Sequence, residues 1–409
     1  MFPTARDPIV SLLQSAAAAV TRQHPASHGL TVAAGQLATD ATQPTDDCVT
    51  LGLELLRSSV AGDAARQGVL LDRLRFSRCD PLWAKTLLDY VRDLMPNGEV
   101  RPVPYIRHAT LDDFVVEAPR TDLRIALFSD WGTGTVEARR MAALLAAQKP
   151  DIAIHLGDIY YSGTAAECDA HFLAPLRAVL PDTRLFTLCG NHDVYSGGAG
   201  YYGLLARIGQ PASYFCLRSP DRSWQVLAGD TGLNDRDPFE EATALTHLDP
   251  GEEFWHADKL RGFPGRTILL THHQPFSAFA QMGPAARDPT NPALLASYRQ
   301  LAAAGRIDAW FWGHEHRLRL YAPYRGVTGR NIGYGAIPVA VDARADAPLP
   351  GLIDPPTVDA HVEIGAANGV YSHGFATLDC RVDGIEASYW TLAHPDQPVH
   401  RELLGVAQS

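Results

Sequence analysis

The strongest constraint on the fold is a pattern that occurs five times: a short apolar run is followed at once by a block of polar residues. Runs of this kind, short and partly β-branched, favour buried strands. In open α/β sheets, ligands bind at the edge formed by the carboxyl ends of the strands. We therefore expect the five blocks to meet at one sheet edge. The blocks are Asp130-Trp131-Gly132, Gly157-Asp158-Ile159-Tyr160-Tyr161, Gly190-Asn191-His192-Asp193, His272-His273-Gln274-Pro275 and Gly313-His314-Glu315-His316.

One such block by itself would carry little weight, because each has an ordinary structural explanation. Asp158 could simply open a turn with Tyr161 packed beneath it, and a lone histidine after a strand is more often a structural residue. Five blocks in one order, each at the end of a predicted strand, are very hard to reach by chance. Together they collect aspartate, asparagine, histidine and tyrosine without cysteine, the mix of ligands that suits iron, manganese or zinc. The pattern therefore predicts a metal centre.

The size and charge of the chain narrow its possible functions. With 409 residues it exceeds what one hydrophobic core usually holds, so we expect two domains or one enlarged domain. The net charge of −11 argues against binding to nucleic acid or to an anionic membrane by bulk charge. The six cysteines are scattered without metal-site spacing and are predicted to be reduced, mostly buried thiols. The apolar patch at 9–20 lacks the basic start of a signal peptide, so we predict a cytoplasmic protein with no membrane span.

Residues 1–120 are predicted to form a helical module that ends in a linker. Asp7-Pro8 and Asp80-Pro81 each look like a helix cap followed by proline at the first helical position. A break rich in proline and glycine at 96–104 ends the helical pattern. No cluster in this module looks catalytic, so we expect it to pack on the main domain or to mediate a homo-oligomer. The alternative is a cap that shapes substrate access.

From residue 121 to 409 the pattern changes to alternating strands and helices, which predicts a parallel sheet with right-handed crossovers. The segment 213–228 predicts two antiparallel strands, and 374–392 predicts a hairpin that turns at Asp383-Gly384. The glycine-rich segment 196–200 is predicted to be a mobile rim. The strands that precede the five blocks are expected at 123–128, 152–156, 184–189, 267–271 and 307–312, and helices at 135–148, 167–180, 252–260 and 292–305.

Taken together, the five blocks resemble those of the calcineurin-like metallophosphoesterases, and within that superfamily those of the purple acid phosphatases. The wider superfamily opens with an Asp-x-His block, whereas this chain has Asp130-Trp131-Gly132. The missing histidine and the tyrosine three residues after Asp158 are the purple acid phosphatase pattern. The resemblance covers residues 121–392. It implies an α/β fold, a four-layer α/β/β/α sandwich, for a catalytic domain at 121–409 that the all-helical module precedes.

The resemblance also implies a set of ligands for two metal ions. The family block His-x-Pro selects His273 over His272, which would then support the ligands or contact the substrate. Tyr161 has an ordinary pKa of about 10, so its phenolate needs a strongly acidic cation, which favours Fe(III) in the first site. The second site would hold Fe(II), zinc or manganese. The implied ligands are Asp130, Asp158, Tyr161 and His316 for the first ion, with Asp158 bridging to a second ion that Asn191, His273 and His314 complete.

The chemistry that the resemblance implies is the hydrolysis of phosphate esters. Two adjacent cations would hold a bridging hydroxide as the nucleophile and would bind the phosphate oxygens. His192 would contact the substrate and protonate the leaving group, with Asp193 holding its ring; the alternative is that His192 only orients a ligand. Asn191 would also contact the substrate. Arg317 stands where the family usually has asparagine, and it could reach the phosphate or remain solvated.

Three functions are open on this reasoning. The leading prediction is hydrolysis of a small phosphate monoester, and hydrolysis of a phosphodiester or nucleotide on the same centre is the runner-up. A third alternative, from a different class, is a degenerate metal-binding scaffold that recognises a partner through the helical module. The intact blocks and His192 argue against it, because an inactive descendant has no reason to keep the acid. Trp131 and Tyr160 are predicted to pack rather than to bind.

Overall fold

The computed structural model describes most of the chain from residue 101 onward and a shorter part before it. The described residues are 63–66, 70, 75, 80, 82–93, 101–238, 245–341, 347–359, 362–367 and 369–405. The helices predicted before residue 63 lie outside them, as do Cys48 and Cys79, while the other four cysteines are buried free thiols, as predicted. The helix predicted after Asp80 is α5 (Leu82–Asp93), and the Asp80 carboxylate accepts the Leu82 N–H at 2.9 Å. No helix among these residues is long and apolar enough to cross a membrane.

The strand that precedes Asp130 lies inside a six-stranded sheet. The strand order is β15-β14-β13-β2-β3-β4, with β2, β3 and β4 parallel and the other three antiparallel. The strands predicted before the first three blocks are therefore confirmed as a parallel set, and the predicted hairpin extends the same sheet. The strands are β2 (Leu123–Phe128), β3 (Ile152–His155), β4 (Arg184–Thr187), β13 (Gly374–Arg381), β14 (Gly384–Thr391) and β15 (His400–Leu404).

A second sheet of seven strands carries the other two blocks. Its order is β1-β5-β6-β7-β8-β10-β9, with β6, β7, β8 and β10 parallel and β5 and β9 antiparallel to their neighbours β6 and β10. β1 was not predicted, because three residues are too few to give a periodic pattern. It is the edge strand of this sheet and precedes residue 120, the predicted end of the helical module. The strands are β1 (Val115–Glu117), β5 (Phe215–Arg218), β6 (Trp224–Ala228), β7 (Arg266–Leu270), β8 (Ala309–Trp312), β9 (Leu318–Leu320) and β10 (Gly329–Ile332); β11 (Ala366–Ala367) and β12 (Val370–Tyr371) form a separate ribbon.

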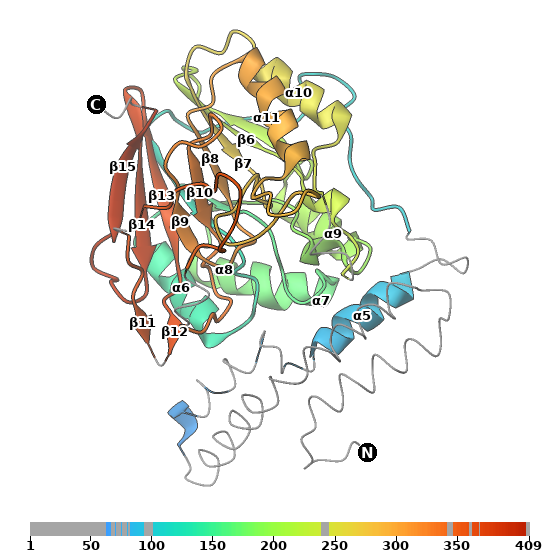
Figure 1. Ribbon diagram of the computed structural model, residues 1–409, viewed down its shortest axis with the longest axis vertical. Helices are drawn as coiled ribbons and strands as arrows, with labels where there is room; N and C mark the ends of the chain where they lie inside the picture. The colour runs from blue at the N-terminus through green and yellow to red at the C-terminus, as the bar shows by residue number, and fades with distance from the viewer. Residues whose placement is uncertain are drawn as a thin grey trace.

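The two sheets pack face to face and helices cover both outer faces (Figure 1). Apolar side chains of both sheets, such as Ile154 of the first and Val226 of the second, fill one core between them. Two helices pack on the outer face of the first sheet and two on the outer face of the second. This is the expected four-layer α/β/β/α sandwich. The helices are α6 (Val136–Ala147) and α8 (Ala174–Val179) on the first sheet, and α10 (Pro250–Leu260) and α11 (Pro292–Ala304) on the second.

The helices begin close to their predicted positions, with two differences. Thr135 caps α6 as its hydroxyl accepts the Ala138 N–H at 3.1 Å. The single helix predicted at 167–180 is instead divided, with a π-helical segment in its middle. The segment 196–200, predicted as a mobile rim, leads into a helix that begins after Gly198, whose φ of 78° is readily adopted by glycine. These elements are α7 (Ala165–Glu167), η1 (Cys168–Leu173), α8 and α9 (Ala199–Ile208).

One ion pair joins the two sheets through the core. Arg330 on β10 donates from Nε and Nη2 to the two carboxylate oxygens of Glu402 on β15, both at 2.6 Å. The Tyr389 hydroxyl donates to the same carboxylate at 2.6 Å. Burial favours a higher pKa for Glu402, but the Arg330 guanidinium outweighs burial and lowers the pKa. Glu402 is therefore charged and paired at neutral pH.

Replacing Glu402 by Gln should lower the free energy of unfolding by about 3 kcal/mol at neutral pH, because a buried guanidinium then lacks its counter-charge. Urea unfolding measures the difference, with Glu117→Gln at the exposed end of β1 as a control expected within about 0.5 kcal/mol of wild type. Since the folded pKa of Glu402 lies below its unfolded value, its contribution is present above the unfolded pKa and is lost as the pH falls through the folded value. A difference that stays constant down to about pH 3 would contradict this role.

Candidate metal centre

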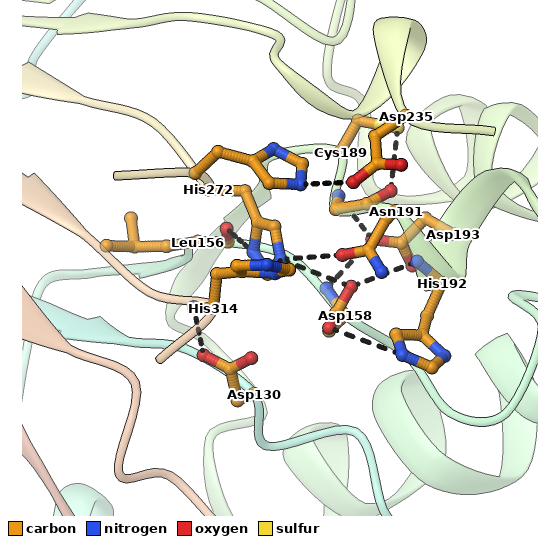
Figure 2. Close-up of polar contacts among 12 residues, drawn as sticks. Asp130, Leu156, Asp158, Cys189, Asn191, His192, Asp193, Asp235, His272 and His314 are labelled. Carbon is orange, nitrogen blue, oxygen red and sulfur yellow. Dashed lines mark hydrogen bonds and ion pairs between the residues drawn. The ribbon is translucent and has the colours of Figure 1, made fainter. Parts of the chain in front are cut away.

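All five polar blocks meet at one edge of the sandwich, although they come from two sheets rather than one. The blocks follow β2, β3 and β4 in the first sheet and β7 and β8 in the second. Two hydrogen bonds tie the sheets together there: the Asp130 carboxylate accepts the His314 N–H at 3.0 Å, and the His272 Nδ1–H donates to the Leu156 carbonyl at 2.9 Å. Figure 2 shows Asp158 with His272, Asn191 and His192 around it. The sandwich thus brings together residues that are far apart in the sequence.

The first group of possible ligands is Asp130, Asp158 and His316, each of which offers an atom within 4.8 Å of the others. Asp130 and Asp158 are fully buried, whereas the His316 side chain is 35% exposed and forms the open side of the group. The Tyr160 hydroxyl lies among all three: it is 3.2 Å from Asp130 Oδ1, 2.9 Å from Asp158 Oδ2 and 3.0 Å from His316 Nε2. This group corresponds to the predicted first site, except in its tyrosine.

The hydroxyls of the two adjacent tyrosines contact different carboxylates. Tyr161 was predicted as a ligand, but its hydroxyl donates to the carboxylate of Asp80, which comes just before α5. Tyr160 was predicted to pack, and its hydroxyl is the one that reaches Asp130 and Asp158. Asp80 offers Tyr161 an acceptor outside the five blocks. The spacing after Asp158 selects Tyr161 as the ligand, and that assignment stays a prediction.

The second group of possible ligands is His272, His273 and His314, again with one atom each within 4.8 Å of the others. His272 Nε2 is 3.1 Å from Asn191 Oδ1, 3.4 Å from Asp158 Oδ1 and 3.3 Å from His314 Nδ1. His272 Nε2 therefore lies beside Asn191, Asp158 and His314, three of the residues predicted to bind the second ion. The sequence assigned this position to His273 and a supporting or substrate-contacting role to His272.

His273 instead turns toward a different pair of side chains. Its Nδ1 lies 2.8 Å from the Thr231 hydroxyl and its Nε2 lies 3.1 Å from Asp235 Oδ2. Both partners come from the segment after β6, which carries no recognisable motif, so sequence reasoning did not find them. The ring of His273 still lies 4.6 Å from that of His314, at the rim of the group.

The hydrogen bonds around His272 show that this group fits a cation. The Leu156 carbonyl can only accept, so His272 Nδ1 carries the proton, and since burial lowers the pKa of His272 its Nε2 presents a lone pair. Asn191 Nδ2 donates to the Tyr195 hydroxyl at 2.6 Å, which leaves Asn191 Oδ1, a second lone pair, facing His272 Nε2. Two acceptors 3.1 Å apart with no proton between them repel, and a metal ion would relieve this repulsion.

The buried charges lead to the same conclusion. Burial raises the pKa of Asp158 well above its usual value, and the carboxylates of Asp130 and Asp193 add to the effect. At Asp130, burial favours a higher pKa, but His316, His272 and Ser129 together outweigh burial and lower the pKa. Within the described part of the chain, the ion pairs of Asp130 and Asp158 are with histidines alone. Without a nearby cation, burial and like charge therefore favour the neutral form of Asp158, and a bound metal ion would favour its ionised form.

Glycine at two of the strand ends permits the close approach of the carboxylates. A side chain at Gly190 would overlap the Asp158 carboxylate, and one at Gly313 would come within 2.6 Å of Asp130 Oδ2. Neither neighbour is the end of a long flexible side chain, so neither could move aside cheaply. The glycines of these blocks are thus required by the packing of the ligands.

His192 is positioned beside the centre by a backbone carbonyl. Its Nδ1–H donates to the Tyr161 carbonyl at 2.8 Å, which leaves Nε2 toward Asp158 Oδ2 at 4.0 Å. Asp193 was predicted to hold this ring, but its carboxylate accepts three backbone N–H groups, from Gly190, Asp158 and Ile159, at 2.8 to 3.1 Å. It therefore fixes two loops instead. Burial lowers the pKa of His192 to about 3, and a bound phosphate dianion would act in the opposite direction.

A cavity of about 260 Å³ opens next to the exposed side of His316. Arg317 lines it with a half-buried side chain, and its guanidinium lies 4.8 Å from the centre of the Tyr371 ring. Glu315 turns inward, where Asn331 Nδ2 donates to it at 3.0 Å. The remaining lining residues are Phe279, His314, Arg319 and Val339.

Comparison with known proteins identifies the domain. A family model described as "calcineurin-like phosphoesterase" matches residues 123–318, a stretch that contains all five blocks. The chain carries a calcineurin-like phosphoesterase domain. The match indicates that this domain is that of a metallophosphoesterase, which hydrolyses phosphoric esters, and the family fits the metal-ligand groups described above.

The phosphoesterase is also similar to individual proteins. Tartrate-resistant acid phosphatase type 5 of Rattus norvegicus is 24% identical over 254 residues, which are 55% of this chain and 74% of the relative; the Mus musculus protein gives the same values. Among solved structures, GAP50, the anchor in the inner membrane complex of Plasmodium, has a TM-score of 0.49 at 13% identity and covers 71% of this chain and 90% of that one. A purple acid phosphatase from yellow lupin (Lupinus luteus) seeds has a TM-score of 0.48 at 15% identity, covering 68% and 53%.

Proposed function

We propose that the chain hydrolyses small phosphate monoesters at a centre of two metal ions. The observation that carries the proposal is the position of Asp158 between the two groups of ligands. Its Oδ1 faces His272 of the second group at 3.4 Å, while its Oδ2 faces the Tyr160 hydroxyl of the first group at 2.9 Å. One carboxylate with an oxygen on each side is the arrangement that a bridging ligand needs.

The residues divide into two proposed sets around Asp158. The first set is Asp130, Asp158 and His316 with one of the two tyrosines, and the second is Asp158, Asn191, His272 and His314, with His273 at its rim. A bound pair of cations supplies an activated water and neutralises the charge of the phosphate. Iron(III) in the first site and iron(II), zinc or manganese in the second suit these oxygen and nitrogen donors.

The chain's own residues account for the remaining chemistry. His192 points its Nε2 toward the space beside Asp158 and is the proposed general acid, because it can give a proton to the leaving-group oxygen. The Tyr161 carbonyl fixes the ring of His192, and Asp193 holds the loops that carry both. Arg317 at the cavity is the proposed contact for the phosphate, since a guanidinium matches its oxygens. Asn191 would contact the substrate from the other side.

The experiment that tests this function compares two substrates on the purified, metal-loaded, full-length protein. p-Nitrophenyl phosphate should be turned over with a kcat/KM at least about tenfold above that of bis(p-nitrophenyl) phosphate. The reverse order would assign the centre to diesters. If about two metal ions bind per chain and neither ester is hydrolysed, the chain is a metal-binding protein of another kind.

The role of His192 is tested by the leaving group. His192→Ala should lower kcat about 10²-fold for an alkyl phosphate, whose leaving group needs a proton, and much less for p-nitrophenyl phosphate, whose leaving group does not. His247→Ala, at an exposed histidine, serves as the control and should leave both rates unchanged. Equal losses for both substrates would show that His192 only orients a ligand.

A further inference from the structure

Helix α5, which precedes the phosphoesterase domain, is fixed against the metal centre. The Asp80 carboxylate at its start accepts the Tyr161 hydroxyl, and Lys85 Nζ lies 3.3 Å from Glu167 Oε1 of α7. At the other end, the carboxylate of Asp93 lies so close to Gly197 that a side chain there would overlap it. Figure 1 shows α5 beside α7, apart from the two sheets. The helix is therefore attached along its length to the loops that carry the second and third blocks.

The residue that α5 presents to this centre is Trp83. Its indole ring lies 5.6 Å from the ring of His192 and 5.1 Å from that of Tyr161, measured between ring centres. The side chain is only partly buried and packs on the cluster of Tyr160, Tyr161 and Ile337. Val339 packs on the same cluster and also lines the cavity at His316. The indole and the substrate cavity thus border one apolar cluster.

We propose that Trp83 is a specificity-determining residue whose indole gives the leaving group of the substrate an aromatic face. The proposal rests on the proposed function, and in particular on His192 as the acid. A leaving-group oxygen that accepts a proton from His192 must come within about 3 Å of its Nε2. His192 Nδ1 is already bonded to the Tyr161 carbonyl, so Nε2 is the nitrogen left for the leaving group. Since the indole is centred 5.6 Å from the same ring, we expect the rest of the leaving group to reach Trp83.

The aromatic face of the Trp83 indole selects the class of leaving group. Aromatic rings attract each other at centre-to-centre distances of about 4.5 to 7 Å in edge-to-face or offset arrangements, beyond the gain from burying their surface. A phenol or another planar aromatic alcohol can use this attraction, whereas a short alkyl alcohol cannot. The preferred substrates are therefore aryl phosphate monoesters, and the preference is supplied from outside the family domain.

The test measures binding rather than turnover. Phenylphosphonate and methylphosphonate are stable analogues that carry an aromatic or a small group on phosphorus. Titration calorimetry on the metal-loaded, full-length protein should show that Trp83→Leu weakens phenylphosphonate about tenfold and methylphosphonate less than about twofold. Trp83→Phe should keep most of the wild-type affinity for phenylphosphonate. Leu88→Ala, at an exposed position of the same helix, should bind both compounds as wild type does.

The outcomes separate this inference from the proposed function. Equal weakening of both analogues, no change in either, or no binding of phenylphosphonate to wild type would each overturn the role of Trp83. If wild type hydrolyses p-nitrophenyl phosphate in such a case, the monoesterase proposal stands alone. If Trp83→Leu selectively lowers the affinity for phenylphosphonate but the wild-type protein hydrolyses no monoester, Trp83 binds the aryl group and the monoesterase proposal fails. Metal content and thermal unfolding, measured for every variant, show whether the site and fold remain intact, and Trp83→Met, which also lacks an aromatic ring, replaces Trp83→Leu as the test if the latter unfolds.

Discussion

Asp158→Asn is expected to lower kcat/KM for p-nitrophenyl phosphate by at least about 10³-fold and to leave fewer than two metal ions per chain. Asp158 is the one carboxylate that faces both groups of ligands, so its loss weakens both at once. Assay of the initial rate together with elemental analysis measures the two effects. Retention of two ions with full activity would remove Asp158 from the centre.

The same variant should keep its fold, which separates a lost site from a lost structure. Asp158 is buried beside the carboxylates of Asp130 and Asp193, and asparagine keeps its shape while removing their mutual repulsion. Without metal, the Asn variant should therefore unfold at a temperature no lower than the wild-type protein. Asp182→Ala, at an exposed turn, is the matched control and should change neither activity nor metal content.

The two adjacent tyrosines offer the second large effect. If the first site holds iron(III) bound by a phenolate, the iron-loaded protein has a visible charge-transfer band, and Tyr160→Phe should abolish it. Tyr161→Phe is the natural control. The Tyr161 hydroxyl donates to Asp80, so its removal should leave the band in place. The reason for the difference is that the Tyr160 hydroxyl already lies within 3.2 Å of Asp130, Asp158 and His316.

Each of the other outcomes has a clear meaning. Loss of the band in Tyr161→Phe alone would restore the assignment made from the sequence, with Tyr161 leaving Asp80 when the metal binds. A colourless protein that is fully active with zinc or manganese would refute iron while sparing the phosphoesterase. Either result can be read from an absorption spectrum and a metal analysis of the same sample.

Much of the fold could be predicted because the apolar runs before the five blocks are short and uninterrupted. Each of these runs became a strand, and Thr135 marked the start of a helix through its capping hydroxyl. The strands that escaped prediction are brief or mixed in polarity, like β1 with its three residues. Their position is decided by pairing with a distant strand, and a local pattern does not contain that information.

The blocks that form the site could be predicted, whereas the choice between adjacent residues of one block depends on partners that are distant in the sequence. Within His272-His273, the choice depends on the Leu156 carbonyl, which holds the ring of His272 from 116 positions away. Within Tyr160-Tyr161, it depends on Asp80, 81 positions away. A spacing rule counts residues along one strand end and cannot include such partners. Trp83 was missed for the same reason, since on its own helix it reads as one more apolar position.

The pairing of β2 has a consequence for how the protein reaches its native state. β2 lies between β3, which follows it closely, and β13, and Arg124 on β2 forms an ion pair with Asp379 on β13 at 2.7 Å, 255 positions along the chain. During synthesis, the strand that precedes Asp130 therefore lacks its neighbour on one side until β13, at Gly374–Arg381, has been made. Contacts this distant in sequence slow folding. We expect the edge that holds the ligands to acquire its final shape only after the hairpin of β13 and β14 has docked on β2.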